Sequence, residues 1–81
     1  MSKPNVFTIQ PNPTNEAFDV TLSSGDYELH VFDAIGRLVF EQNTEGSVKV
    51  DVRNWQNGLY IISLLDRTTK VKSHNKVIVQ H

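Results

Sequence analysis

The sequence predicts an all-β domain, a small antiparallel β-sandwich of about seven strands. Apolar and polar residues alternate with a period of two along most of the chain, which is the spacing of a half-buried strand. Residues that form turns recur at intervals of roughly 8–12 residues, as in small sandwiches. The chain has 81 residues, enough for one core and one domain.

The strands follow from local patterns. Alternation marks residues 18–22 and 27–31, and it is cleanest at 48–52, where three valines are separated by charged residues. Residues 59–65 are almost all apolar, which predicts a central strand covered on both faces. Shorter apolar runs complete the set at 7–10, 38–40 and 77–79. Between the strands lie turn signals at residues 11–13, 24–26, 34–36, 44–46, 57–58 and 66–67.

Composition excludes several classes of protein. There is no cysteine, so a disulfide scaffold, a thiolate metal site and a cysteine nucleophile are excluded. The net charge of −1 argues against a nucleic-acid partner. No apolar run approaches the roughly 20 residues of a membrane span, and we expect a protein that does not span a membrane.

Charge is distributed unevenly along the chain. Residues 67–81 carry four basic and no acidic residues, whereas residues 1–66 carry four basic and nine acidic ones. Lys70, Lys72, His74 and Lys76 are spaced by two, so one face of a strand would carry all four. Two interpretations are open: a basic stripe offered to a partner, or lysines that protect a sheet edge from aggregation. A turn at residues 73–75 would interrupt the stripe.

The segment 55–60, with the sequence Trp-Gln-Asn-Gly-Leu-Tyr, admits two structures. It resembles a tyrosine corner, in which the hydroxyl of Tyr60 bonds a backbone group a few residues upstream and fixes the arch between two sheets. Asn57-Gly58 is also the strongest two-residue hairpin signal. Both structures belong to an all-β fold.

The residues give little sign of catalytic chemistry. His30, His74 and His81 are too scattered to predict a metal site, and no nucleophile elbow or glycine-rich phosphate loop is present. We therefore expect no enzyme, no catalytic residue, no metal and no cofactor.

Four motifs in order resemble one family. They are Pro11-Asn12-Pro13, the segment 31–39 with Gly36-Arg37, the segment 55–62 and the terminal residues 76–79. The sequence is similar, over residues 6–81, to the type A C-terminal sorting domains of the type IX secretion system. Residues 1–5 are then a linker or a cloning remnant.

The resemblance implies an immunoglobulin-like sandwich that ends a secreted protein of a Gram-negative bacterium. Such a domain follows an N-terminal cargo domain, passes through the periplasm and directs its parent across the outer membrane to the cell surface or the medium. Its partners are the outer-membrane translocon or shuttle proteins and a sortase, which usually cuts before the first strand.

Two groups of residues are expected to carry this role. Residues that fix the shape of the domain are Pro11, Asn12, Pro13, Gly36, Arg37, Gly58 and Tyr60. Residues expected to contact the machinery are Lys70, Lys72, Lys76, Val77, Ile78 and Val79, because a terminal edge strand is accessible and can add to a partner's sheet.

Two other functions are compatible with a β-sandwich. One is a fibronectin-like or immunoglobulin-like spacer in an extracellular enzyme. The other is a carbohydrate-binding module, which would need exposed coplanar aromatic rings. Trp55 is the residue that would provide such a ring, if it lies exposed beside another one.

Overall fold

The structure, a computed structural model, describes residues 7–81. It confirms the all-β prediction with seven strands, and the predicted linker at residues 1–5 lies outside the described residues. The strands are β1 (Thr8–Gln10), β2 (Ala17–Thr21), β3 (Tyr27–Phe32), β4 (Leu38–Thr44), β5 (Val48–Asp51), β6 (Gly58–Asp66) and β7 (Lys72–Val79). No helix with the length and hydropathy of a membrane span occurs among residues 7–81.

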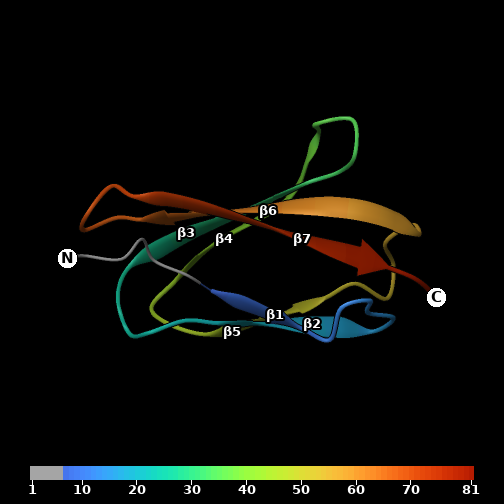
Figure 1. The fold of residues 1–81 in the computed structure, drawn as a ribbon, viewed down its shortest axis with the longest axis horizontal. Helices are drawn as coiled ribbons and strands as arrows, with labels where there is room; N and C mark the ends of the chain where they lie inside the picture. Colours follow the sequence, from blue (N-terminus) through green and yellow to red (C-terminus); the bar gives the residue numbers. More distant parts are fainter. Residues whose placement is uncertain (1–6) are drawn as a thin grey trace.

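The strands form two antiparallel sheets that pack as an immunoglobulin-like sandwich. One sheet has three strands in the order β1-β2-β5, and the other has four in the order β4-β3-β6-β7. In Figure 1 the four-stranded sheet forms the upper layer, and the turn between β3 and β4 protrudes above it. This topology leaves β4 and β7 at the two edges of the larger sheet.

Alternation within each strand directs one set of side chains into the space between the sheets. Tyr27, Leu29 and Val31 of β3 face inward, while Glu28 and His30 between them are half-exposed. The buried hydrophobic side chains are Phe7, Ile9, Phe18, Val20, Tyr27, Leu29, Val31, Val50, Val52, Tyr60, Ile62, Leu64, Val77 and Val79. Each sheet therefore has one buried face, as sandwich packing requires.

The prediction that residues 59–65 are covered on both faces is wrong. β6 is central within its sheet, but only its inward side chains Tyr60, Ile62 and Leu64 are buried. Leu59 is exposed and Ile61 is half-buried on the opposite face. A two-layer sandwich has no third layer to cover that face, so these apolar side chains remain at the surface.

The segment 55–60 forms a tyrosine corner and not a hairpin. β5 and β6 belong to different sheets, so the chain crosses between layers at this point. The hydroxyl of Tyr60 donates a hydrogen bond of 2.8 Å to the carbonyl oxygen of Gln56. Gly58 has a φ of 152°, a conformation that residues with a Cβ rarely adopt.

The outer edge of β7 is held by the segment that contains the two prolines. The side chain of Asn12 accepts a hydrogen bond of 3.0 Å from the Ile78 amide and donates one of 3.1 Å to the Lys76 carbonyl. The Thr14 amide donates to the Ile78 carbonyl, and the Gln80 amide donates to the Thr14 carbonyl, both at 2.8 Å. Residues 12–14 therefore occupy the edge of β7 from Lys76 to Gln80.

The end of the chain is attached to the tyrosine-corner loop. The His81 amide donates a hydrogen bond of 2.9 Å to the side-chain oxygen of Asn57. The Nε2 atom of His81 lies 2.7 Å from the carbonyl oxygen of Trp55. The last strand is thus fixed along its edge and also at its end.

Replacement of Tyr60 by phenylalanine should lower the free energy of unfolding by about 1 kcal/mol, because the Gln56 carbonyl loses its donor. Urea denaturation measures this change. Tyr27→Phe is the matched control, since Tyr27 is also buried but its hydroxyl bonds no residue in the described part of the chain. Equal losses in the two variants would contradict a stabilising tyrosine corner.

Asn12→Ala should lower the free energy of unfolding by about 1–2 kcal/mol, because two hydrogen bonds to the β7 backbone are lost together. The exposed Asn15 makes no hydrogen bond within residues 7–81, so Asn15→Ala should leave stability nearly unchanged. Hydrogen exchange at the Ile78 amide gives a local measurement. An unaltered exchange rate in Asn12→Ala would show that Asn12 does not hold this edge.

Candidate recognition surface

Three of the four predicted basic positions share one face of β7. Lys72, His74 and Lys76 alternate with inward residues and point to the outer face of the four-stranded sheet. Residues 73–75 do not break the strand, which continues from Lys72 to Val79. The basic stripe therefore has three members and lies at a sheet edge.

Lys70 does not belong to this stripe. It lies in the turn before β7 with a φ of 64°, and its amide donates a hydrogen bond of 2.7 Å to the Asp66 carbonyl. Val71 is exposed beside it. The turn that reverses the chain between β6 and β7 needs a residue with left-handed backbone angles at this position. Alternation of side chains between two faces requires an extended strand, so it does not extend back to Lys70.

The terminal run Val77-Ile78-Val79 divides between core and surface. Val77 and Val79 are 0% and 1% exposed, whereas Ile78 is 44% exposed on the outer face. While β7 remains in its sheet, only the side chain of Ile78 is available to a partner. Val77 and Val79 hold the strand onto the core.

Cross-strand register divides the outer face into an apolar half and a polar half. Leu38, Phe32 and Ile61 lie opposite one another on successive strands, and the row ends at Lys76 on β7. Beside this row, Leu59 lies opposite Ile78. We call these residues the apolar half: Phe32, Leu38, Leu59, Ile61 and Ile78.

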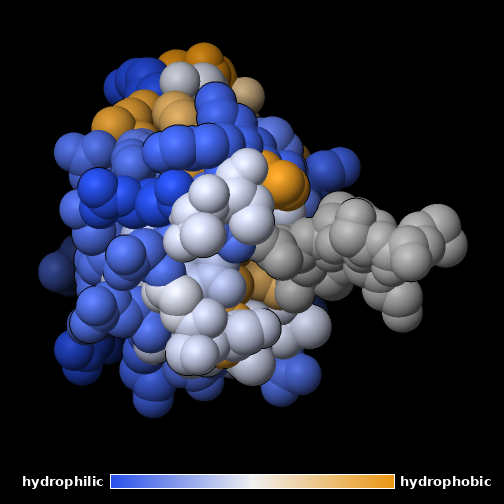
Figure 2. Space-filling view, turned by 90° about the vertical axis from the view of Figure 1, so that its left-hand side faces the viewer, coloured by the Kyte–Doolittle hydropathy of each residue, from blue (hydrophilic) through white to orange (hydrophobic). Residues whose placement is uncertain are grey.

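Charged and polar side chains make up most of the other rows, in which Leu65 is the apolar exception among the described residues. Glu41, His30, Ser63 and His74 form one row across the four strands. His30 lies 3.4 Å from the carboxylate of Glu41. The end of the molecule that faces the viewer in Figure 2 is largely hydrophilic, and hydrophobic residues appear at its top.

The turn between β3 and β4 is organised by the carboxylate of Asp33. Its Oδ1 atom accepts hydrogen bonds from the amides of Ile35 and Arg37, and its Oδ2 atom lies 2.8 Å from the Nε of Arg37. Gly36, one of the residues expected to fix the shape of the domain, adopts a φ of 90°, which glycine reaches more easily than other residues. The arrangement holds the Nε side of the Arg37 guanidinium, although the side chain as a whole is 73% exposed.

Two carboxylates have a lowered pKa for different reasons. The Arg37 backbone amide is the main cause of the lowered pKa of Asp33, with smaller contributions from its guanidinium and the Ile35 amide, while burial opposes them. For Asp51 the Arg53 side chain is the main cause, followed by its amide, and the pKa is about 2. The lowered pKa of Asp51 therefore depends mainly on an arginine side chain, and that of Asp33 depends mainly on a backbone amide.

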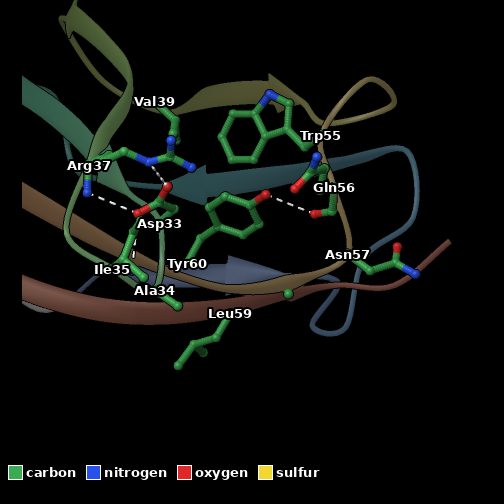
Figure 3. A pocket seen from close by; sticks show the side chains of 11 residues that line it. Asp33, Ala34, Ile35, Arg37, Val39, Trp55, Gln56, Asn57, Leu59 and Tyr60 are labelled. Carbon is green, nitrogen blue, oxygen red and sulfur yellow. Dashed lines mark hydrogen bonds and ion pairs between the residues drawn. The ribbon is translucent and has the colours of Figure 1, made fainter.

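Two predicted motifs line one cavity of about 420 Å³. Asp33, Ile35 and Arg37 form one side, and residues 55–60 form the other (Figure 3). Sequence reasoning identified both motifs as shape determinants but did not bring them together. No local signal reports this contact, because it depends on the pairing of β3 with β6 within the four-stranded sheet.

Trp55 is half-buried and does not form an exposed aromatic platform. Its ring lies 4.9 Å from that of Tyr60, 6.2 Å from Phe40 and 6.4 Å from Phe18, measured between centroids. Every aromatic side chain among residues 7–81 is buried or half-buried. Trp55 therefore does not provide the exposed aromatic ring that a carbohydrate-binding module would need.

Arg37→Gln should raise the pKa of Asp33 only part of the way to its ordinary value of 3.8, because the backbone amide of residue 37 remains. Arg53→Gln should raise the pKa of Asp51 more, because it removes the main cause. Carboxyl carbon shifts followed by NMR against pH measure both values, and each variant is the control for the other.

Both carboxylates stabilise the folded state when they are ionised. Each pKa is lower in the folded state, so each carboxylate stabilises the fold above its ordinary pKa. This stabilisation is lost as the pH falls through the lowered folded value, which for Asp51 is about 2. Full recovery of the ordinary pKa of Asp33 in Arg37→Gln would contradict the leading role of the backbone amide.

Comparisons with known proteins agree with this architecture. The family model described as the secretion system C-terminal sorting domain matches residues 8–80. The fold is similar to part of PorZ, an essential bacterial surface component of the type IX secretion system of Porphyromonas gingivalis, with a TM-score of 0.80 and 20% identity. The match covers 93% of this chain but only 11% of PorZ. A search of curated protein sequences finds no match.

The family match covers nearly all of the described residues. It confirms the predicted role as a sorting signal of type IX secretion, with export to the cell surface or secretion in a Gram-negative bacterium. The chain belongs to the family of secretion system C-terminal sorting domains.

Proposed function

We propose that this domain directs an attached N-terminal cargo domain from the periplasm through the outer-membrane translocon of the type IX system. A shuttle protein and a surface sortase are the further partners, and the sortase cuts before β1. The family match over residues 8–80 is the observation that carries this proposal. The likeness of the fold to part of a surface component of the same system is compatible with it.

The proposed contact surface is the outer face of the four-stranded sheet. It joins the three-membered basic stripe on β7 to the apolar half through Lys76, which lies opposite Ile61. An apolar centre with charged side chains at its rim is the usual composition of a protein interface. A partner of this face would present apolar side chains flanked by carboxylates.

Lys70, Val77 and Val79 take different roles in this proposal from those expected at first. Lys70 lies outside the stripe but is exposed. It adds positive charge near the first residue of β7, without sharing the face of the stripe. Val77 and Val79 are core residues that keep Ile78, Lys76 and Lys72 in register. Recognition then depends on the folded domain and not on a detached terminal peptide.

A reporter tests the function directly. It carries an N-terminal signal peptide and residues 6–81 at its C-terminus, in a host with a working type IX system. Reporter at the cell surface or in the medium is the expected result. Retention in the periplasm, with the domain shown to be folded, would favour the spacer or another extracellular module. Removal of residues 77–81 is not a suitable control, because it also empties two core positions.

Lys76→Gln should reduce export of this reporter several-fold while leaving its unfolding midpoint nearly unchanged, because an exposed charge at an interface rim contributes to association more than to folding. Lys49→Gln is the matched control, since Lys49 is an exposed strand residue of the three-stranded sheet. Cell fractionation measures export, and thermal denaturation measures folding. Equal export of both variants would remove Lys76 from the contact surface.

A further inference from the structure

The cavity between the β3–β4 turn and the tyrosine corner is not used by the contact surface proposed above. Its lining residues come from two segments about 20 residues apart in the chain, 33–39 and 55–60. The turn and the tyrosine corner explain the glycines, Asp33 and Tyr60 of these two segments. They do not explain why an exposed arginine lies beside two aromatic rings.

The walls of the cavity suit an apolar side chain. The rings of Tyr60 and Trp55 lie 4.9 Å apart between centroids, tilted at 49°, and both line the cavity together with Val39. Val39 is exposed at the edge strand β4, so one wall is open to a ligand from solvent. A volume of about 420 Å³ lies at the lower end of the range of ligand sites, roughly 300–1,000 Å³.

The guanidinium group of Arg37 supplies hydrogen-bond donors to one wall of the cavity, beside the Asp33 carboxylate that also lines it. Figure 3 shows this group above the Asp33 carboxylate, on the side of the Trp55 and Tyr60 rings. Its Nε atom is held by Asp33 Oδ2 at 2.8 Å. Within residues 7–81 its two terminal nitrogens have no hydrogen-bond acceptor.

Asp33 pairs with the Nε side of this guanidinium and offsets part of its charge, but it leaves the terminal nitrogens available to a ligand. Its side chain is only 15% exposed, and its two oxygens already accept from two backbone amides and from Arg37 Nε. The outer edge of the guanidinium, formed by its two terminal nitrogens, has the forked geometry that pairs with a second carboxylate. The site therefore combines an apolar hollow with an oriented anion-binding group.

We propose that this cavity binds an extended segment of a partner protein that inserts a large apolar side chain between Val39 and the Trp55–Tyr60 pair. A carboxylate two residues along the same segment then pairs with the terminal nitrogens of Arg37, since alternate side chains of an extended chain share one face. This inference rests on the proposed sorting function and names the chemistry of one contact in it.

The test uses the whole chain and three peptides. The probes are acetyl-Phe-Ser-Glu-amide, its glutamine analogue and its lysine analogue, followed by NMR at the indole N–H of Trp55 and the Nε–H of Arg37. The glutamate peptide should bind in the millimolar range and about two- to fivefold more tightly than the glutamine peptide, as expected for one exposed ion pair. The lysine peptide should bind more weakly still.

Arg37→Gln should abolish the preference for glutamate while retaining weak binding of the phenylalanine, provided that the spectrum shows a folded domain. Arg53→Gln, which removes an exposed arginine outside the cavity, should retain the preference. Absence of shifts at Trp55, equal affinity for the three peptides, or a preference that survives Arg37→Gln would each overturn the inference.

The reporter assay separates this inference from the proposed function. Export of the intact domain without peptide binding would leave the sorting function standing and reject the cavity as a peptide site. Peptide binding with no export would support the cavity and reject sorting. Normal export of a reporter that carries Arg37→Gln, with peptide preference lost, would reject a role of the cavity in sorting.

Discussion

The attachment of residues 12–14 to the edge of β7 is the interaction on which the rest of the structure depends. β7 is an edge strand, yet it supplies Val77 and Val79 to the core. An edge strand with one bonded side opens more easily than a central strand, because only one row of hydrogen bonds holds it. The four hydrogen bonds made by Asn12 and Thr14 give β7 a second row along its C-terminal half.

This second row has a consequence for recognition. The edge from Lys76 to Gln80 is occupied, so a partner cannot add a strand there unless residues 12–14 first leave. A partner could contact the outer face of the four-stranded sheet, in contrast, without any rearrangement of the domain. Its rows of side chains are set by the register of β6 with β7, and that register is fixed by the burial of alternate residues. A folded surface is therefore a simpler contact than a free terminal strand.

Local patterns predicted the strands, gave the tyrosine corner as one of two structures for residues 55–60 and marked Gly36 as a residue that fixes the shape, because each depends on residues close in sequence. The period of two also placed Lys72, His74 and Lys76 on one face. It failed at Lys70, where the backbone of a turn replaces that of a strand. The bonds from Asn12 to β7 join residues 64 and 66 positions apart, and the cavity joins two loops, so neither leaves a local pattern to detect.

The distribution of apolar residues distinguishes the functions that a small sandwich could have. A spacer needs only soluble outer faces, and exposed hydrophobic patches carry a risk of aggregation that selection tends to remove. Here the apolar half retains Leu38, Leu59 and Ile78 at the surface, beside Lys76. Trp55, the residue best suited to stack on a sugar, is instead packed between Phe18, Phe40 and Tyr60. Apolar side chains exposed on one sheet, together with a tryptophan packed against the core, favour the proposed contact with another protein over a sugar-binding role.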